Sequence, residues 1–188
     1  VITSFSFPPY NFVILNFITF PLFLWFLIQI KKKKSNWINF NVGWIFGIGY
    51  FFSSLYWIVY ALTFEEIFKP LIPIALILIP SFLALFYGLV TLITLKFKLE
   101  KNFSSIVIFS FVFGVIEFIR GFIFGGFPWN LIVFSWTNYT SSLQILSSIG
   151  TYSFNLISIS IFLLPIVIVF KKNFKFKLIL LSFLLLVL

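Results

Sequence analysis

Long apolar runs alternate with short polar segments along the whole chain, and this pattern predicts membrane-spanning helices. Each run is about 20 residues long, enough for a helix to cross a bilayer core of about 30 Å. The expected spans are about 11–30, 40–62, 71–95, 104–124 and 145–170, with a sixth at 177–188 that stops at the end of the sequence. A transmembrane barrel would show shorter alternating segments. The expected fold is therefore all-α, a polytopic transmembrane helix bundle of five full spans plus a truncated sixth, which makes residues 1–188 one transmembrane domain.

The positions of the lysines orient the predicted helices. Segments 31–34, 96–101 and 171–177 hold every lysine except Lys69. Lysine-rich loops of multi-pass proteins face the cytoplasm, so the segments between them, including 125–144, are expected on the outer side. The net charge of +9 comes mainly from these loops and does not indicate nucleic-acid binding.

The composition supports a membrane protein and excludes several kinds of chemistry. The chain is 62% hydrophobic and 9% charged, whereas a soluble domain carries roughly a quarter charged residues. It contains no cysteine and no histidine, which excludes disulfides, a thiol nucleophile and the usual Cys/His zinc sites. The sequence starts at Val1 rather than Met and ends at Leu188 inside an apolar run, so we expect both ends to be cut.

A charge pair lies inside the fourth apolar run. Glu117 and Arg120 are three residues apart, a spacing that puts both on one face of a helix expected to end near Phe124. One charge at the bilayer centre costs roughly 2.5–3.5 kcal/mol on insertion scales. Two interpretations remain open. The pair orients the helix within the bundle, or it lies under an outward-facing site where Arg120 can reach a lipid phosphate.

The stretch Gly125–Asn130 follows this pair and predicts a helix end and a turn. Its glycines permit positive φ, and Pro128 prevents simple continuation of the helix. Trp129, Trp136 and Tyr139 suit the headgroup level of a membrane. The segment is either an ordinary loop with an aromatic belt or a segment that dips back into the interface.

Three smaller patterns complete the candidate features. Ser147, Thr151, Asn155 and Ser158 share one face of the expected fifth helix, and we interpret them as structural contacts to other helices. Gly43 and Gly47 form a G-x-x-x-G pattern that permits close helix approach. Tyr56 and Trp57 lie near the outer end of the second helix, either as belt residues or as the lining of a lipid groove.

The order of these residues resembles a known family. Glu117-Phe118-Ile119-Arg120-Gly121 followed by Gly126-Phe127-Pro128-Trp129-Asn130 resembles the E-x-x-R-G…G-F-P-W stretch of bacterial apolipoprotein N-acyltransferases. Similar matches are Phe7-Pro8-Pro9-Tyr10, Gly43 to Gly47 with Tyr56-Trp57, and Gly150-Thr151-Tyr152. One stretch departs: Val133-Phe134-Ser135-Trp136 stands where the family usually has Gly-Tyr-Ser-Gln.

The resemblance implies a two-step acyl transfer at the inner membrane of a Gram-negative bacterium. A phospholipid donates an acyl chain to the cysteine of a Glu-Lys-Cys triad, and the amino group of a lipoprotein's diacylglyceryl-cysteine then accepts it. The triad belongs to a nitrilase-like domain expected beyond Leu188. No catalytic residue is therefore assigned in this chain, which alone should be inactive, and no cofactor or metal is expected.

The resemblance also suggests which residues here serve the reaction. The expected lipid- or substrate-facing loop consists of Gly126, Phe127, Pro128, Trp129 and Asn130. Glu117 and Arg120 would support this loop, and Tyr56 and Trp57 are further candidates for a lipid groove. Two other classes of function remain open: a small transporter or channel-like protein whose Glu117–Arg120 pair lines a pathway, and an assembly subunit without activity.

Overall fold

A computed structural model describes residues 1–30 and 35–170, and all regular structure in these ranges is helical. The α-helices are α1 (Asn16–Gln29), α2 (Asn36–Ser54), α3 (Ile72–Thr94), α4 (Phe103–Arg120), α5 (Thr140–Leu143), α6 (Ile145–Ile149), α7 (Thr151–Leu163) and α8 (Ile166–Phe170). The 3₁₀ helices are η1 (Ile2–Ser6), η2 (Val13–Leu15), η3 (Tyr56–Thr63), η4 (Glu66–Leu71), η5 (Ile123–Gly125) and η6 (Ile132–Trp136). The all-α prediction is confirmed for this part of the chain.

Fewer helices than expected are long enough to cross a membrane. Three qualify by length and composition within the described residues: Glu66–Thr94, Phe103–Arg120 and Thr151–Phe170. Asn36–Ser54 and Tyr56–Thr63 add a fourth if the two, bent by 51° at Leu55, count as one span. The helix Val13–Gln29 is apolar but shorter. Five full spans are thus not confirmed, and the expected sixth at 177–188 lies outside the described residues, as do the lysine segments 31–34 and 171–177.

Two predicted helix boundaries are wrong, and backbone conformation explains both. The helix expected to reach Phe124 ends at Arg120: φ is −121° at Phe122 and becomes positive at Phe124, Gly125 and Gly126. The helix expected to start at 145 is interrupted at Gly150, whose φ of 80° separates α6 from α7. Positive φ is easily adopted by glycine, and it cannot continue a right-handed helix.

The G-x-x-x-G prediction of close helix approach is confirmed between α2 and α3. The Gly43 amide donates a hydrogen bond to Thr91 Oγ1 at 3.1 Å, and the Thr91 hydroxyl donates to the Asn39 carbonyl at 2.7 Å. A Cβ at Gly47 would lie 2.9 Å from the Cα of Ala84. Only residues without a side chain allow two helix backbones to come this close.

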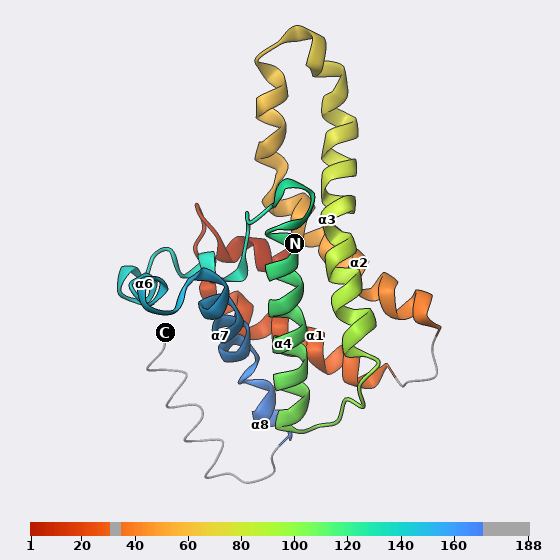
Figure 1. The fold of residues 1–188 in the computed structure, drawn as a ribbon, viewed down its shortest axis with the longest axis vertical. Coiled ribbons are helices and arrows are strands. Elements are labelled where there is room, and N and C mark those ends of the chain that lie inside the picture. Colours follow the sequence, from red (N-terminus) through yellow and green to blue (C-terminus); the bar gives the residue numbers. More distant parts are fainter. Residues whose placement is uncertain (31–34, 171–188) are drawn as a thin grey trace.

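The middle of the bundle is α4, which packs against α3 on one side and α7 on the other (Figure 1). Phenylalanine rings fill the space between the helices. Phe20 of α1 contacts Phe113 of α4 edge-on at 5.7 Å between ring centroids, and it stacks on Phe162 of α7 at 6.1 Å. In Figure 1, η3 and the first turns of α3 form a hairpin that extends beyond the other helices. The two charged residues in the last turn of α4, Glu117 and Arg120, are buried among these helices.

Candidate functional site

A buried ion pair occupies the last turn of α4. Arg120 Nη2 lies 3.4 Å from Glu117 Oε1, and both side chains are 0% exposed. The i, i+3 spacing brings them together on one face, as expected from the sequence. Further hydrogen bonds offset the cost of removing such a pair from solvent; the carboxylate and both Arg120 Nη atoms have them, and Arg120 Nε has none among the described residues.

The Glu117 carboxylate is satisfied by donors from three helices. The Tyr87 hydroxyl of α3 donates to Glu117 Oε1 at 3.1 Å, and Asn155 Nδ2 of α7 donates to Glu117 Oε2. Arg120 supplies the third donor from α4 itself. Hydrogen bonds to an ionised group are roughly twice as strong as those between neutral groups. The carboxylate therefore ties α3, α4 and α7 together at one point.

The Arg120 guanidinium is turned inward, toward the loop that follows α4. Its Nη1 donates to the Trp129 carbonyl at 3.1 Å, and its central carbon lies 5.2 Å from the centre of the Phe51 ring. The Arg120 carbonyl accepts a hydrogen bond from the Phe127 amide at 3.1 Å. With its side chain buried, Arg120 is not directed at a lipid phosphate, which was one of the two roles left open by the sequence.

The loop from Trp129 to Val133 is held by side chains of other helices as well. Tyr50 of α2 donates its hydroxyl to the Asn130 carbonyl at 2.8 Å, and Asn130 Nδ2 donates to the Ser54 carbonyl at 3.3 Å. The Val133 amide donates to Asn155 Oδ1 at 2.9 Å. The loop backbone thus has partners on α2, α4 and α7.

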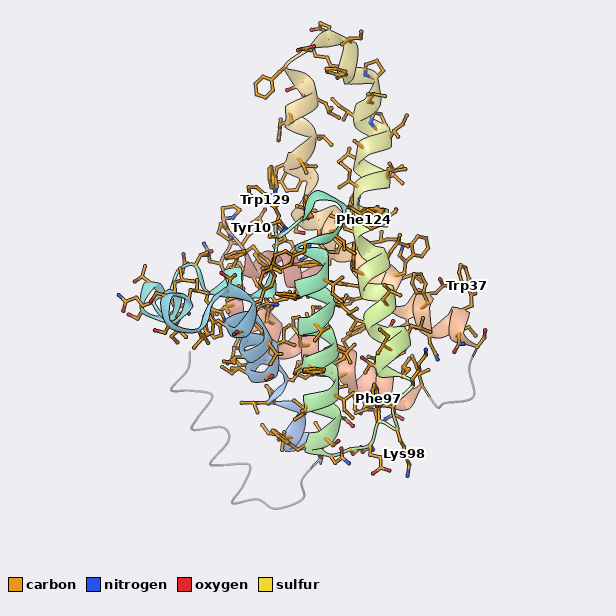
Figure 2. All side chains as sticks on the ribbon, viewed as in Figure 1. Tyr10, Trp37, Phe97, Lys98, Phe124 and Trp129 are labelled. Atoms are coloured by element: carbon orange, nitrogen blue, oxygen red, sulfur yellow. The ribbon has the colours of Figure 1, made fainter. Side chains whose placement is uncertain are left out.

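This loop forms one wall of a cavity of about 670 Å³. Three segments line it: Ser4, Phe5 and Phe7–Tyr10 at the start of the chain, Ser53, Ser54, Tyr56 and Trp57 at the end of α2, and Pro128, Trp129, Asn130, Phe134 and Thr137 after α4. Figure 2 shows Tyr10 and Trp129 near one another, far from Trp37 and Lys98. The lining side chains are aromatic, apolar or uncharged polar, which suits an apolar ligand with a few neutral hydrogen-bonding groups.

The cavity joins most of the residues singled out in the sequence. Pro128, Trp129, Asn130, Tyr56 and Trp57 all line it, and the Trp57 and Trp129 rings meet edge-on at 5.8 Å. The other two members of the expected loop, Gly126 and Phe127, are half-buried and do not line it. Neither Glu117 nor Arg120 lines the cavity; Arg120 contacts the loop backbone at the Trp129 carbonyl, and Glu117 contacts Arg120.

Two expectations about flanking residues are corrected. Trp136, expected at the headgroup level, is 3% exposed, and its Nε1 donates to Ser158 Oγ at 3.0 Å. The polar stripe does not continue over one helix, because Ser147 lies on the separate helix α6 and is exposed. Two of its members on α7 do bind other elements: Ser158 binds Trp136, and Asn155 binds both Glu117 and Val133.

The sequence did not single out Tyr50 or Tyr87, and it assigned Asn155 only a general packing role. Aromatic residues make up 23% of the chain, so two tyrosines among them carry no signal of their own. One usable signal existed for Asn155. An amide in the apolar fifth run needs a polar partner, and the fourth run supplies two charged ones, Glu117 and Arg120.

The chemistry available within this arrangement is recognition and support. No group of three or more Asp, Glu, His or Cys side chains that could bind a metal occurs among residues 1–30 and 35–170. The buried carboxylate is occupied by its three donors and does not face the cavity. The site can therefore hold an apolar molecule against a fixed aromatic wall, and the residues that line it form no nucleophile–base pair.

Residues 1–164 match the family described as the apolipoprotein N-acyltransferase N-terminal domain. Apolipoprotein N-acyltransferase of Rhizobium rhizogenes is 30% identical over 165 residues, covering 84% of this chain and 31% of the relative. That of Brucella melitensis is 32% identical over 165 residues, with the same coverage. That of Sinorhizobium fredii is 29% identical over 175 residues, covering 89% of this chain and 33% of the relative. The chain therefore spans about a third of the length of these relatives.

Proposed function

Because this chain belongs to the family of the apolipoprotein N-acyltransferase N-terminal domain, we propose that it is the membrane part of such an acyltransferase. The enzyme transfers an acyl chain from a phospholipid to the N-terminal diacylglyceryl-cysteine of a lipoprotein. Both partners are lipid-anchored, so the reaction has to take place at a membrane surface. The role proposed for residues 1–188 is to anchor the catalytic part there and to admit lipid to it.

The bond-making chemistry belongs to residues outside this chain. A thiolate is the effective nucleophile for acyl transfer through a thioester, and this chain contains no cysteine. The relatives extend over about three times the matched length, which leaves room for a catalytic domain with a Glu-Lys-Cys triad. No cofactor is needed for this chemistry. Residues 1–188 alone are proposed to be inactive.

The proposed membrane arrangement follows from the lysine distribution. Residues 1–188 form one domain in the inner membrane with five full spans and part of a sixth. The lysine-rich segments face the cytoplasm, and residues 125–144 face the periplasm. This orientation puts the cavity at the periplasmic end, since its lining includes residues 128–137. The short helix Val13–Gln29 counts as the first span in this arrangement.

The cavity between the start of the chain, the end of α2 and the Pro128–Asn130 loop is the observation that carries the proposal. At about 670 Å³ it is within the usual size range of ligand pockets, roughly 300–1,000 Å³. Trp57 and Trp129 are 42% and 56% exposed, so each offers a large apolar surface to a ligand. Lipid acyl chains match this surface, because burying apolar area contributes roughly 25 cal/mol per Å².

The transporter alternative has less support. A pathway lined by the Glu117–Arg120 pair would expose these side chains to an aqueous or ligand-filled space. Both are 0% exposed, and neither lines the cavity next to the Pro128–Asn130 loop. Their charged groups already form hydrogen bonds with Tyr87, Asn155 and Trp129, so a transported ion would have to displace these partners.

The proposal is tested in the complete acyltransferase that contains these residues. Trp129→Ala should lower acyl transfer from phospholipid to a diacylglyceryl peptide by about 10-fold, the effect of losing roughly 1.5 kcal/mol of apolar contact. Trp37→Ala is the matched control, because Trp37 is 68% exposed at the start of α2 and does not line the cavity. Equal activity of the two variants, at equal amounts in the membrane, would overturn the assignment of the cavity.

A further inference from the structure

Three buried side chains hold the backbone from Trp129 to Val133, of which Trp129 and Asn130 line the cavity and Val133, in η6, does not. Arg120 binds the Trp129 carbonyl, Tyr50 binds the Asn130 carbonyl, and Asn155 binds the Val133 amide. They come from α4, α2 and α7, so three helices each contribute one side chain that binds this backbone. An ordinary surface loop has most of its backbone polar groups bonded within the loop or to water.

Neither Tyr50 nor Asn155 lines the cavity, and both are almost completely buried, at 1% and 0% exposure. The surroundings fix the direction of each polar group. The Tyr50 ring stacks on the Tyr87 ring at 5.7 Å and meets the Phe51 ring edge-on at 5.0 Å. The hydroxyl is thereby aimed at one loop carbonyl.

Asn155 uses both ends of its amide. Its nitrogen donates to Glu117 and its oxygen accepts from Val133. A rotation of the amide by 180° would bring its nitrogen to the Val133 amide and its oxygen to the carboxylate, so both bonds would be lost. Asn155 therefore links the position of the loop to the buried ion pair.

We propose that Tyr50 and Asn155 are positioning residues, which fix the Trp129 side of the cavity and thereby determine how well the acyl chain of a phospholipid is held there. This rests on the proposed function, since it takes the cavity to be the lipid site. The two residues act only through the loop and touch no lipid themselves. Losing either contact should change the environment of Trp129 and the occupancy of the cavity together.

Tyr50→Phe is the sharpest test, and Tyr87→Phe is its matched control. Both tyrosines are 1% exposed, both belong to the same ring stack, and each variant loses one hydroxyl. The Tyr50 hydroxyl binds the loop, whereas that of Tyr87 binds Glu117, which keeps its two other donors. A general loss of packing would affect both variants alike.

The experiment uses the chain in nanodiscs of phosphatidylethanolamine and phosphatidylglycerol, with 5-fluorotryptophan at its tryptophans. The ¹⁹F resonance of Trp129 is assigned from its disappearance in Trp129→Phe. Occupancy of the cavity is measured by photolabelling with phosphatidylethanolamine that carries a diazirine on one acyl chain. Tyr50→Phe should move the Trp129 resonance by more than its line width. It should also lower labelling of the cavity residues about 3-fold or more, the effect of one lost hydrogen bond.

The outcomes separate this inference from the function on which it rests. A shifted resonance and reduced labelling in Tyr50→Phe, with neither change in Tyr87→Phe, supports it. An unshifted Trp129 resonance in Tyr50→Phe overturns it, as do equal shifts in the two variants. A shift in a chain whose cavity is not labelled even before substitution supports the positioning of Trp129 and overturns the lipid site.

Asn155→Leu gives a second measurement on the other end of the loop. It should move the resonance of the nearby Trp136 as well as that of Trp129, because the Val133 amide loses its acceptor. Because Asn155→Leu also takes a donor from Glu117, its helix content is compared with that of the unsubstituted chain by circular dichroism. An unshifted Trp136 resonance in a variant of unchanged helix content would overturn the contact between Asn155 and Val133.

Discussion

Removing one member of the Glu117–Arg120 pair should destabilise the protein more than removing both. Glu117→Leu leaves the guanidinium of Arg120 buried without a counter-charge and deprives Tyr87 and Asn155 of their acceptor. Arg120→Met leaves the carboxylate buried with two neutral donors. Breaking a buried ion pair from one side costs about 3–5 kcal/mol.

The double variant Glu117→Leu/Arg120→Met should lose less than either single variant. It contains no buried charge, and a buried pair replaced by apolar residues of similar volume is often close to neutral. What remains is the loss of partners for Tyr87, Asn155 and the Trp129 carbonyl, about 1 kcal/mol each. The two substitutions should therefore be coupled by about 3 kcal/mol or more.

The measurement is a double-mutant cycle of reversible unfolding in mixed micelles. Sodium dodecyl sulfate is increased against a mild detergent, and helix content is followed by circular dichroism. The cycle isolates the pairwise energy, because both single variants remove the same contact. Additive losses in the double variant would mean that the two charges do not stabilise one another. The buried ion pair described here would then be refuted as the support of the loop.

Two further predictions use the same unfolding assay. Gly43→Ala should lower the free energy of unfolding by about 1–3 kcal/mol, because its Cβ would lie 2.0 Å from a backbone carbonyl oxygen of α3. Gly49→Ala, whose Cβ would meet nothing nearer than 3.7 Å, should have little effect. Equal losses in the two variants would contradict the close approach of α2 and α3. Ser158→Ala should lower the free energy of unfolding by about 1 kcal/mol, because Trp136 Nε1 loses its acceptor. Ser160→Ala should lower it less, because the Ser160 hydroxyl donates to the Leu156 carbonyl of its own helix. The reverse order would exclude the contact between Ser158 and Trp136.

The main elements of the fold could be predicted because apolar length and charge are local properties of the sequence. The spacing of Glu117 and Arg120 was enough to predict their pairing, and Gly43 and Gly47 were enough to predict close approach of a neighbouring helix. Neither inference needs information about the rest of the chain. Each depends only on the period of an α-helix.

The network around the loop could not be predicted in the same way. The partners Tyr50 and Asn130 are 80 residues apart, and Asn155 and Glu117 are 38 apart. Which residues pair in this way depends on how the helices pack against one another, and the hydrophobic periodicity of a single helix does not predict that packing. Trp136 is an example. A tryptophan in an uncharged segment is typical of a membrane interface, but the packing of α7 gives Trp136 a buried hydrogen-bond partner, Ser158.

The bend between α2 and η3 frees a backbone group that the loop after α4 uses. A helix continued through Leu55 would use the Ser54 carbonyl in its own ladder. Because the helix breaks there, this carbonyl accepts instead from Trp57 Nε1 at 3.0 Å and from Asn130 Nδ2 at 3.3 Å. In an apolar environment each backbone group without a hydrogen-bond partner costs several kcal/mol. The carbonyl freed by the break in the helix therefore needs a donor from another segment, and the loop after α4 supplies one. The broken helix and the broken loop are therefore one structural unit, and a substitution that straightened α2 would release the segment after α4 without touching it.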